Sequence, residues 1–260
     1  MRSGNPTVPL QNHPPSKPHT PRQNRLLAAL PAPVYRRLLP CLELVALPLG
    51  PMLRPGRGKT HYAYFPTTSV LAMSYVLDKN TSAKAWQIGN EGVAGLSSLC
   101  STIRNDHTEV QTAGHAFRLA MDALRAEFSR GGAFQQLLLG YLQALIAQVS
   151  RLGVCNQYHL LDQRLCRFLL RAFDHACANE LALTQQTAAD LLGVRRVGVT
   201  EAVGRLQAAG IIRCGRGRIT LVDRRKLETR ACACYAAIKQ EFDVLRRSNA
   251  PADARERSAR

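Results

Sequence analysis

Residues 183–223 constrain the fold more strongly than any other part of the chain. Two amphipathic stretches are separated by Gly193, and two short apolar runs then flank a Gly-rich turn at 215–218. Thr184 is a favourable N-cap for the first stretch, because its hydroxyl can accept a backbone N–H. Glycine at 193 permits the positive φ with which many helices end. We therefore predict a helix, a tight turn, a second helix over 195–209 and a small hairpin.

The second predicted helix has two distinct faces. Val199, Val203 and Leu206 recur at i, i+4 and i+7, which is the spacing of a buried stripe. The other face is polar and basic, as on a helix that reads base edges in the major groove, and the arginines of the turn suit a phosphate backbone. The alternative is an ordinary helical hairpin beside a β-hairpin with solvated arginines. The predicted DNA contacts are Thr184, Gln185, Arg195, Arg196, Val197, Thr200, Glu201, Arg205, Arg216 and Arg218.

With the stretch LTQQTAADLLGVRRVGVTEAVGRLQAAGII, the chain resembles bacterial transcription regulators of the Crp/Fnr family over about residues 22–230. The resemblance implies an α+β chain with an N-terminal antiparallel β-roll of the cyclic-nucleotide-binding type, a long dimerisation helix and a C-terminal winged helix-turn-helix. It also implies that Arg196, Val197, Thr200 and Glu201 set DNA specificity. Well-known members have glutamate in place of Val197 and arginine in place of Glu201, so we expect a different target sequence.

The pattern along the chain agrees with this domain order. Residues 1–21 are Pro-rich and poor in large apolar residues, which predicts a disordered arm. A sensor domain is expected over 22–130, the dimerisation helix over 131–158, the winged helix over 159–230, and a C-terminal helix with a disordered basic tail over 231–260. Within the sensor domain we predict short helices at 25–30 and 34–39, then strands at 42–47, 62–65, 70–76, 85–88 and 110–119.

The dimerisation helix is apolar enough to raise the question of a membrane span, because residues 131–150 include no charged residue. Its glutamines argue against a span, and its leucines recur in alternating steps of four and three. That heptad spacing favours a helix paired with a second copy, although an ordinary core helix remains an alternative. The predicted seam consists of Leu138, Leu142, Leu145, Val149 and Leu152.

The resemblance also implies an effector pocket in the sensor domain. In the family, a Gly-Glu pair contacts the ribose of a cyclic nucleotide and an arginine binds its phosphate. This chain offers Gly89, Glu91 and Arg104, but an asparagine separates the first two and Asp106 lies close to the arginine. We therefore expect little cyclic-nucleotide binding, and a roll that has lost its ligand or accepts another one. No cofactor is predicted.

The formal charge of +17 suits a polyanionic partner. Residues 1–22 do not resemble an export signal, so the eight cysteines are expected to be reduced thiols in the cytoplasm. Cys232 and Cys234 could bind a metal or form a redox bridge, but on one helix their thiols would point about 200° apart. No metal site is therefore predicted. The sequence also lacks the common catalytic motifs, which argues against an enzyme.

The sequence thus predicts a cytoplasmic homodimer that binds double-stranded DNA at a near-palindromic operator. RNA polymerase is a further expected partner, and no membrane association is expected. Two other classes of protein remain open. One is a cyclic-nucleotide-responsive or other ligand-binding signalling module whose winged helix makes protein contacts, and the other is a thiol or metal enzyme that uses the cysteines.

Overall fold

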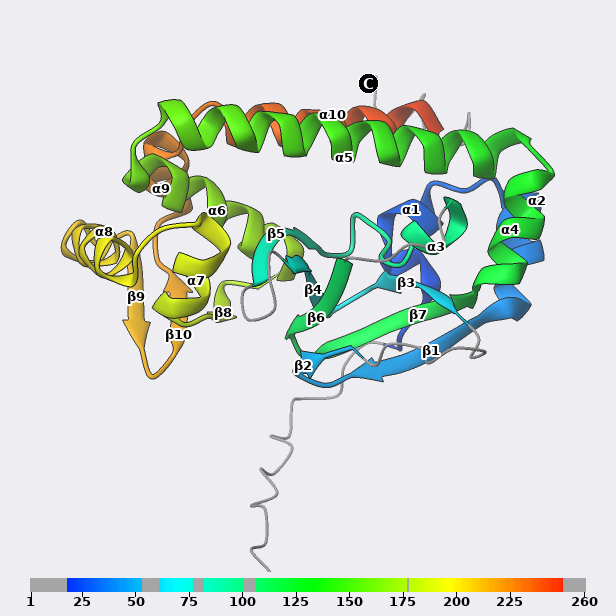
Figure 1. The fold of residues 1–260 in the computed structure, drawn as a ribbon, viewed down its shortest axis with the longest axis horizontal. Coiled ribbons are helices and arrows are strands. Elements are labelled where there is room, and N and C mark those ends of the chain that lie inside the picture. Colours follow the sequence, from blue (N-terminus) through cyan, green and yellow to red (C-terminus); the bar gives the residue numbers. More distant parts are fainter. Residues whose placement is uncertain (1–17, 53–60, 77–81, 101–105, 177, 250–260) are drawn as a thin grey trace, which may run out of the picture.

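The computed structural model describes residues 18–52, 61–76, 82–100, 106–176 and 178–249. Arg104, most of the predicted N-terminal arm and the predicted basic tail beyond residue 249 lie outside these residues. An N-terminal domain of helices and sheets is joined by one long helix to a C-terminal domain, as Figure 1 shows. The mixed α and β content with antiparallel sheets confirms the predicted fold class.

The end of the predicted disordered arm is part of the folded domain, which corrects the boundary at residue 21. Pro21 is buried in a 3₁₀ turn, η1 (Pro21–Gln23), which leads into helix α1 (Arg25–Ala28). Asn24 anchors this entry. Its side chain caps α1 by accepting the N–H groups of Leu26 and Leu27, and donates to the carbonyl oxygens of Pro66 and Gly92. A fully buried amide with all of these partners fixes the chain well before the first strand.

Two antiparallel sheets follow helix α2 (Ala32–Leu38) and the 3₁₀ turn η2 (Leu39–Cys41). The first sheet has the order β1 (Leu42–Leu47), β7 (Gly114–Ala120), β3 (Tyr62–Pro66). The second has the order β2 (Gly50–Pro51), β6 (Asp106–Thr112), β4 (Val70–Val76), β5 (Ser82–Ile88). Helices α3 (Ser97–Cys100) and α4 (Met121–Ser129) complete the domain.

The run 110–119, predicted as one strand, is divided between β6 and β7, which belong to different sheets. The division falls at Ala113, and Gly114 begins β7. A Cβ atom there would lie 2.6 Å from the backbone nitrogen of Ser69, so only glycine allows the two chain segments to approach this closely. Periodicity could not reveal this contact, because residue 69 is distant in sequence.

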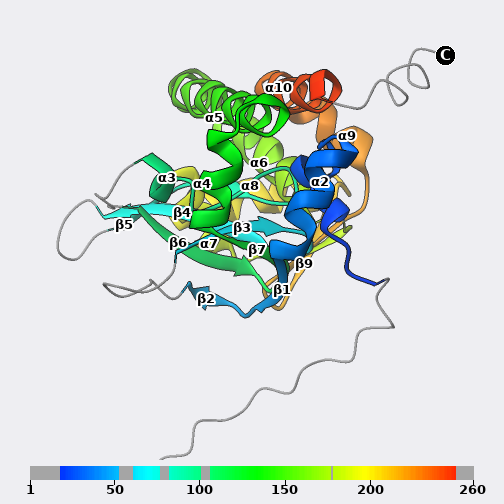
Figure 2. The same ribbon diagram turned by 90° about the vertical axis from the view of Figure 1, so that its right-hand side faces the viewer.

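The long helix α5 (Gly132–Tyr158) runs along both domains, and the C-terminal helix α10 (Cys234–Asn249) lies antiparallel beside it (Figures 1 and 2). Leu245 of α10 packs directly against Gly140 of α5. Among the described residues, α5 alone is long and apolar enough to cross a membrane by length and composition. However, Phe134, Leu137 and other side chains on one of its faces are buried against the N-terminal domain.

The C-terminal domain contains the predicted helix-turn-helix and hairpin. Its elements are α6 (Leu161–Ala176), β8 (Glu180–Ala182), α7 (Gln185–Leu192), α8 (Arg196–Ala208), β9 (Ile212–Gly215), β10 (Arg218–Leu221) and α9 (Arg224–Arg230). Thr184 caps α7 by accepting the N–H of Thr187 at 3.1 Å, and Gly193 ends it at a φ of 64°. Both local predictions are confirmed.

Candidate nucleic-acid interface and domain junction

Helix α8 presents the two faces that its sequence predicts. Val199, Val203 and Leu206 are at most 2% exposed and belong to the core of the C-terminal domain. Arg196, Val197, Thr200 and Glu201 are exposed at the N-terminal half of the helix. Val197 is 69% exposed although it is apolar, so this part of α8 is not packed against the rest of the chain. Such a surface can contact base edges and thymine methyl groups.

Hydrogen bonds connect the start of α7 both to α8 and to the β9–β10 turn. The hydroxyl of Thr200 donates to Oε1 of Gln185 at 2.7 Å, which joins the start of α7 to α8. The backbone N–H of Leu183 donates to the carbonyl oxygen of Gly217 at 2.9 Å, which places the β9–β10 turn beside α7. Arg216 lies in that turn at a φ of 47° and is exposed. Through these two hydrogen bonds, the start of α7 links the turn that carries Arg216 to the exposed end of α8.

Two of the predicted DNA contacts are engaged within the domain. Arg205 forms a bidentate ion pair with Asp162 of α6, with nitrogen–oxygen distances of 2.8 and 2.6 Å. Arg218 pairs with Glu180 across the sheet at 2.5 Å. Each carboxylate offsets the charge of its arginine within the domain, while the two arginine side chains stay 53% and 51% exposed. Over the described residues, no ion pair is recorded for Arg196, which remains the better placed cation.

The structure buries part of the predicted dimer seam on α5 and exposes apolar residues next to it. Leu138, predicted to face a partner, is 1% exposed and packs in the core of the N-terminal domain. The neighbouring Leu139 is 51% exposed, Ile146 61% and Val149 41%. The heptad row that faces outward therefore consists of Leu139, Leu142, Ile146, Val149 and Gly153, of which Leu142 is half-buried. Leu145 is also half-buried, and Leu152 lines the cavity between the domains.

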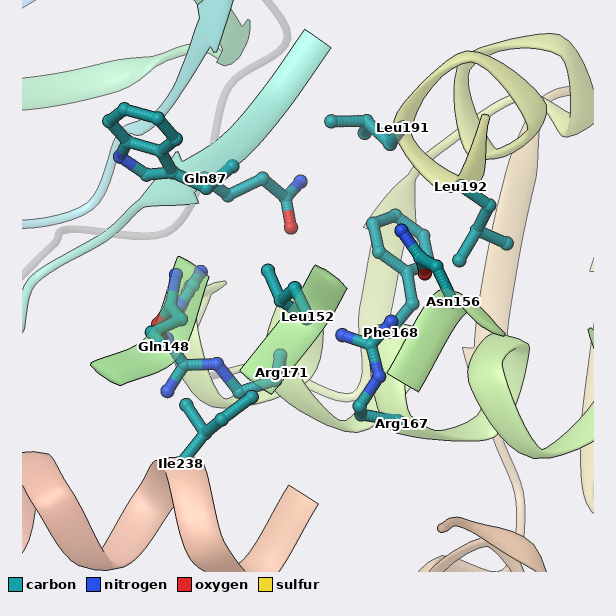
Figure 3. Close-up of a pocket in the computed structure, with 12 residues that line it drawn as sticks. Gln87, Gln148, Leu152, Asn156, Arg167, Phe168, Arg171, Leu191, Leu192 and Ile238 are labelled. Atoms are coloured by element: carbon teal, nitrogen blue, oxygen red, sulfur yellow. Dashed lines mark hydrogen bonds between the residues drawn. The ribbon is translucent and has the colours of Figure 1, made fainter. Parts of the chain in front are cut away.

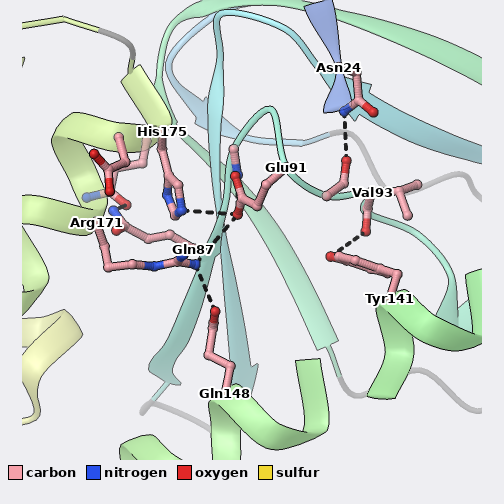
Figure 4. Close-up of polar contacts among 12 residues, drawn as sticks. Asn24, Gln87, Glu91, Val93, Tyr141, Gln148, Arg171 and His175 are labelled. Atoms are coloured by element: carbon pink, nitrogen blue, oxygen red, sulfur yellow. Dashed lines mark hydrogen bonds and ion pairs between the residues drawn. The ribbon is translucent and has the colours of Figure 1, made fainter. Parts of the chain in front are cut away.

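The predicted effector residue Glu91 contacts the C-terminal domain instead of an open pocket. Its Oε1 lies 3.0 Å from Nε2 of His175 and 3.8 Å from a guanidinium nitrogen of Arg171, both on α6 (Figure 4). Arg171 also donates to Oε1 of Gln148 on α5 at 2.8 Å. Burial alone would favour the neutral acid, but the contacts with His175 and Arg171 lower the pKa of Glu91 to about 2.

Gly89 supports the same junction. A Cβ atom at this position would lie 2.6 Å from Cβ of His175, so the loop after β5 packs tightly against α6. Gly89 and Glu91, the candidate effector residues, therefore both contact α6. A ligand could reach the carboxylate of Glu91 only if its contacts with His175 and Arg171 were broken, which agrees with the expectation of little cyclic-nucleotide binding.

A small cavity lies between the two domains and is shown in Figure 3. It has a volume of about 70 Å³ and is lined by residues of β5, α5, α6, α7 and α10. Gln87, Arg167 and Arg171 contribute polar groups to it. Ligand pockets usually measure about 300–1,000 Å³, so this cavity suits a few water molecules rather than a nucleotide.

The sequence interpretation missed a cluster of possible metal ligands at the end of α5. Cys155, His159, Cys232 and Cys234 bring their ligand atoms within 4.8 Å of one another. The argument that Cys232 and Cys234 diverge on one helix is wrong, because Cys232 precedes α10. A usable signal was present in the Cys-x₃-His spacing of 155 and 159, because residues four apart lie close together on a helix.

Comparisons with known proteins agree with this geometry. Residues 163–230 match the model of the Crp-like helix-turn-helix domain. No curated protein sequence matches the chain. Among solved structures, FixK2 from Bradyrhizobium japonicum is similar with a TM-score of 0.62 at 17% identity, covering 74% of this chain and 98% of that one.

Two further solved structures have the same architecture. A CRP/FNR family transcriptional regulator from Thermus thermophilus aligns with a TM-score of 0.57 at 21% identity, over 73% of this chain and 98% of the other. The c-di-GMP responsive global regulator CLP from Xanthomonas campestris aligns with a TM-score of 0.54 at 16% identity, over 74% and 99%. At these identities the likeness establishes the fold, and the helix-turn-helix match establishes the type of the C-terminal domain.

Proposed function

We propose that the chain, which joins a Crp-like helix-turn-helix domain to the fold of Crp/Fnr regulators, is a transcription regulator of the Crp/Fnr type and binds a specific DNA sequence as a homodimer. The observation that carries this proposal is the exposed N-terminal half of α8, held beside a basic turn. Arg196 there can form paired hydrogen bonds with a guanine, while Arg195 and Arg216 are placed to contact phosphates.

The outward row on α5 supports the homodimer. An exposed line of apolar side chains at heptad spacing is costly in water and is buried when two such helices pair. Gly153 continues the row with open space at its Cβ position, which lets two helix backbones approach closely. α10 packs along a different side of α5, through Gly140, so it does not occupy this row. We take the row from Leu139 to Gly153 as the dimer contact.

A dimer of this kind would read two half-sites. Its two α8 helices would reach successive major grooves about 34 Å apart, which predicts a near-palindromic operator. RNA polymerase is the further partner expected of such a regulator, and the cytoplasm is its expected location. The buried face of α5 supports a role in packing within the protein rather than in a membrane.

Selection of duplex DNA from a random library by the purified full-length chain tests the proposal. We expect enrichment of a near-palindrome, and two chains per duplex by light scattering of the complex. The affinity for this site should fall steeply with salt, because arginine–phosphate contacts release counterions. Absence of any enriched sequence at moderate salt would contradict sequence-specific recognition, and enrichment of an asymmetric site by one chain would contradict the dimer.

A further inference from the structure

Four metal-ligating side chains from two distant parts of the sequence meet where α5 ends and α10 begins. Sγ of Cys155 lies 3.5 Å from Sγ of Cys232, and Sγ of Cys234 lies 3.8 Å from Nδ1 of His159. Cys155 is in the last turn of α5 and His159 directly follows that helix, while Cys232 precedes α10 and Cys234 begins it. We call these four residues the Cys₃His cluster.

The spacing of the cluster fits one tetrahedral ion. Zn²⁺ binds thiolate sulfur at about 2.3 Å and imidazole nitrogen at about 2.0–2.1 Å, so tetrahedral geometry separates two sulfur ligands by about 3.8 Å and a sulfur from a nitrogen by about 3.6 Å. The two observed separations, 3.5 and 3.8 Å, are close to these values. Three thiolates and one imidazole also form a common ligand set of structural zinc sites.

The surroundings of the cluster favour a bound ion over simple packing. The three cysteines are at most 6% exposed and form a group separate from the hydrophobic cores. Burial raises the pKa of the Cys232 thiol, and the charge of Arg167 on α6 acts in the opposite direction. Arg167 is 6% exposed, and its Nε has no hydrogen-bond partner among the described residues. Three thiolates around a divalent ion leave one negative charge, which such buried guanidinium groups would offset.

We propose that the Cys₃His cluster binds one Zn²⁺ ion, which fastens the start of α10 to the end of α5. Binding replaces three thiol protons, which pass to solvent, and changes no oxidation state. Cys155 and Cys232 are 77 positions apart, and the winged helix lies between them in the sequence. The ion therefore fixes both ends of the C-terminal domain on the long helix, and its occupancy sets how firmly that domain is held.

Metal analysis of the full-length chain, purified under reducing conditions, is the direct test. We expect about one zinc ion per chain. Replacing the zinc ion with Co²⁺ should give an absorption spectrum with a thiolate-to-metal charge-transfer band and the intense d–d bands of a tetrahedral site. A chain that binds no stoichiometric zinc when zinc is supplied would overturn the proposal, as would a Cys155–Cys232 disulfide found without metal or an octahedral cobalt spectrum.

Variants then locate the site. Cys155→Ser and Cys234→Ser should lose the zinc, whereas the control Cys214→Ser, which alters a half-buried cysteine outside the cluster, should retain it. His159 is only half-buried, so its substitution should be tolerated by the fold. His159→Ala should weaken binding and His159→Cys, which restores a fourth ligand, should recover it. Zinc retained at full stoichiometry in both serine variants would overturn the assignment.

Discussion

The carboxylate of Glu91 lies 3.0 Å from Nε2 of His175, and this contact joins the loop after β5 to helix α6. Both side chains are buried, at 6% and 3% exposure, and Arg171 approaches the same carboxylate. The sequence indicates Glu91 as a candidate effector residue but gives no sign of its pairing with His175, since the two lie in different domains. The pair joins the N-terminal domain to the C-terminal domain.

The stability of the chain should therefore depend on the charge of Glu91. Its folded pKa of about 2 lies below the ordinary value of 4.5, so the stabilisation is complete above pH 4.5 and is lost as the pH falls towards 2. Glu91→Gln should cost about 3 kcal/mol of unfolding free energy at pH 7, and the difference from wild type should shrink below pH 4.5. Urea denaturation at several pH values measures this difference.

Glu43→Gln is the matched control for that experiment. Glu43 also pairs with an arginine, Arg118 at 2.7 Å, but its side chain is 58% exposed. Exposed pairs contribute about 0–1 kcal/mol, so this variant should be close to wild type at pH 7. The buried ion pair would be contradicted if both variants lost the same free energy of unfolding. It would also be contradicted if the loss in Glu91→Gln were the same at pH 7 and at pH 3.

Specific DNA binding should depend on Arg196. Removing its side chain in Arg196→Ala should cost about 1–3 kcal/mol on the selected operator and little on unrelated DNA, because a base contact is lost. Arg205→Ala is the control on the same helix, since its guanidinium is already paired with Asp162. Fluorescence anisotropy with both DNAs at fixed salt measures the four affinities. If Arg205→Ala lost more affinity for the operator than Arg196→Ala, the base contacts would lie elsewhere on α8.

The oligomeric state should depend on the outward row of α5. The double variant Leu139→Glu/Ile146→Glu would place four carboxylates in a two-helix contact and should yield folded monomers by light scattering. Val244→Glu, at a 45% exposed position on α10, is the control and should leave the dimer intact. Leu138→Ala should instead lower the unfolding free energy, by about 2–5 kcal/mol, because Leu138 is a core residue. Dimers that persist after the double change would show that the contact lies elsewhere.

The accuracy of the sequence interpretation follows the range of the interactions involved. The helix-turn-helix was predictable because its determinants are local: Thr184 needs only the N–H of Thr187, and Gly193 needs only its own φ. The predicted seam on α5 includes the buried Leu138 because this helix has apolar residues on two faces. The helical spacing of apolar residues does not identify the face that packs against the core. The burial of Leu138 follows from tertiary packing.

Contacts between distant residues explain the remaining errors. The pair of Glu91 and His175 depends on how the two domains dock, and no local pattern encodes that docking. The Cys₃His cluster joins residues 77 positions apart, and its discovery also required that Cys232 lie outside the helix of Cys234. In both cases the sequence shows residues that can form such contacts, but it does not show that they lie close together in space.

Cyclic AMP and cyclic GMP should have little effect on this chain. A ribose contact from Glu91 would require separating its carboxylate from His175 and Arg171, which leaves buried charges unpaired and costs about 3–5 kcal/mol. The cavity of about 70 Å³ between the domains offers no alternative room. Isothermal titration of the wild type with each nucleotide should show no saturable heat, and DNA affinity should be unchanged by either. Saturable micromolar binding that Glu91→Gln abolishes would show that the junction opens to admit a nucleotide, and that the ion pair is a gate rather than a permanent contact.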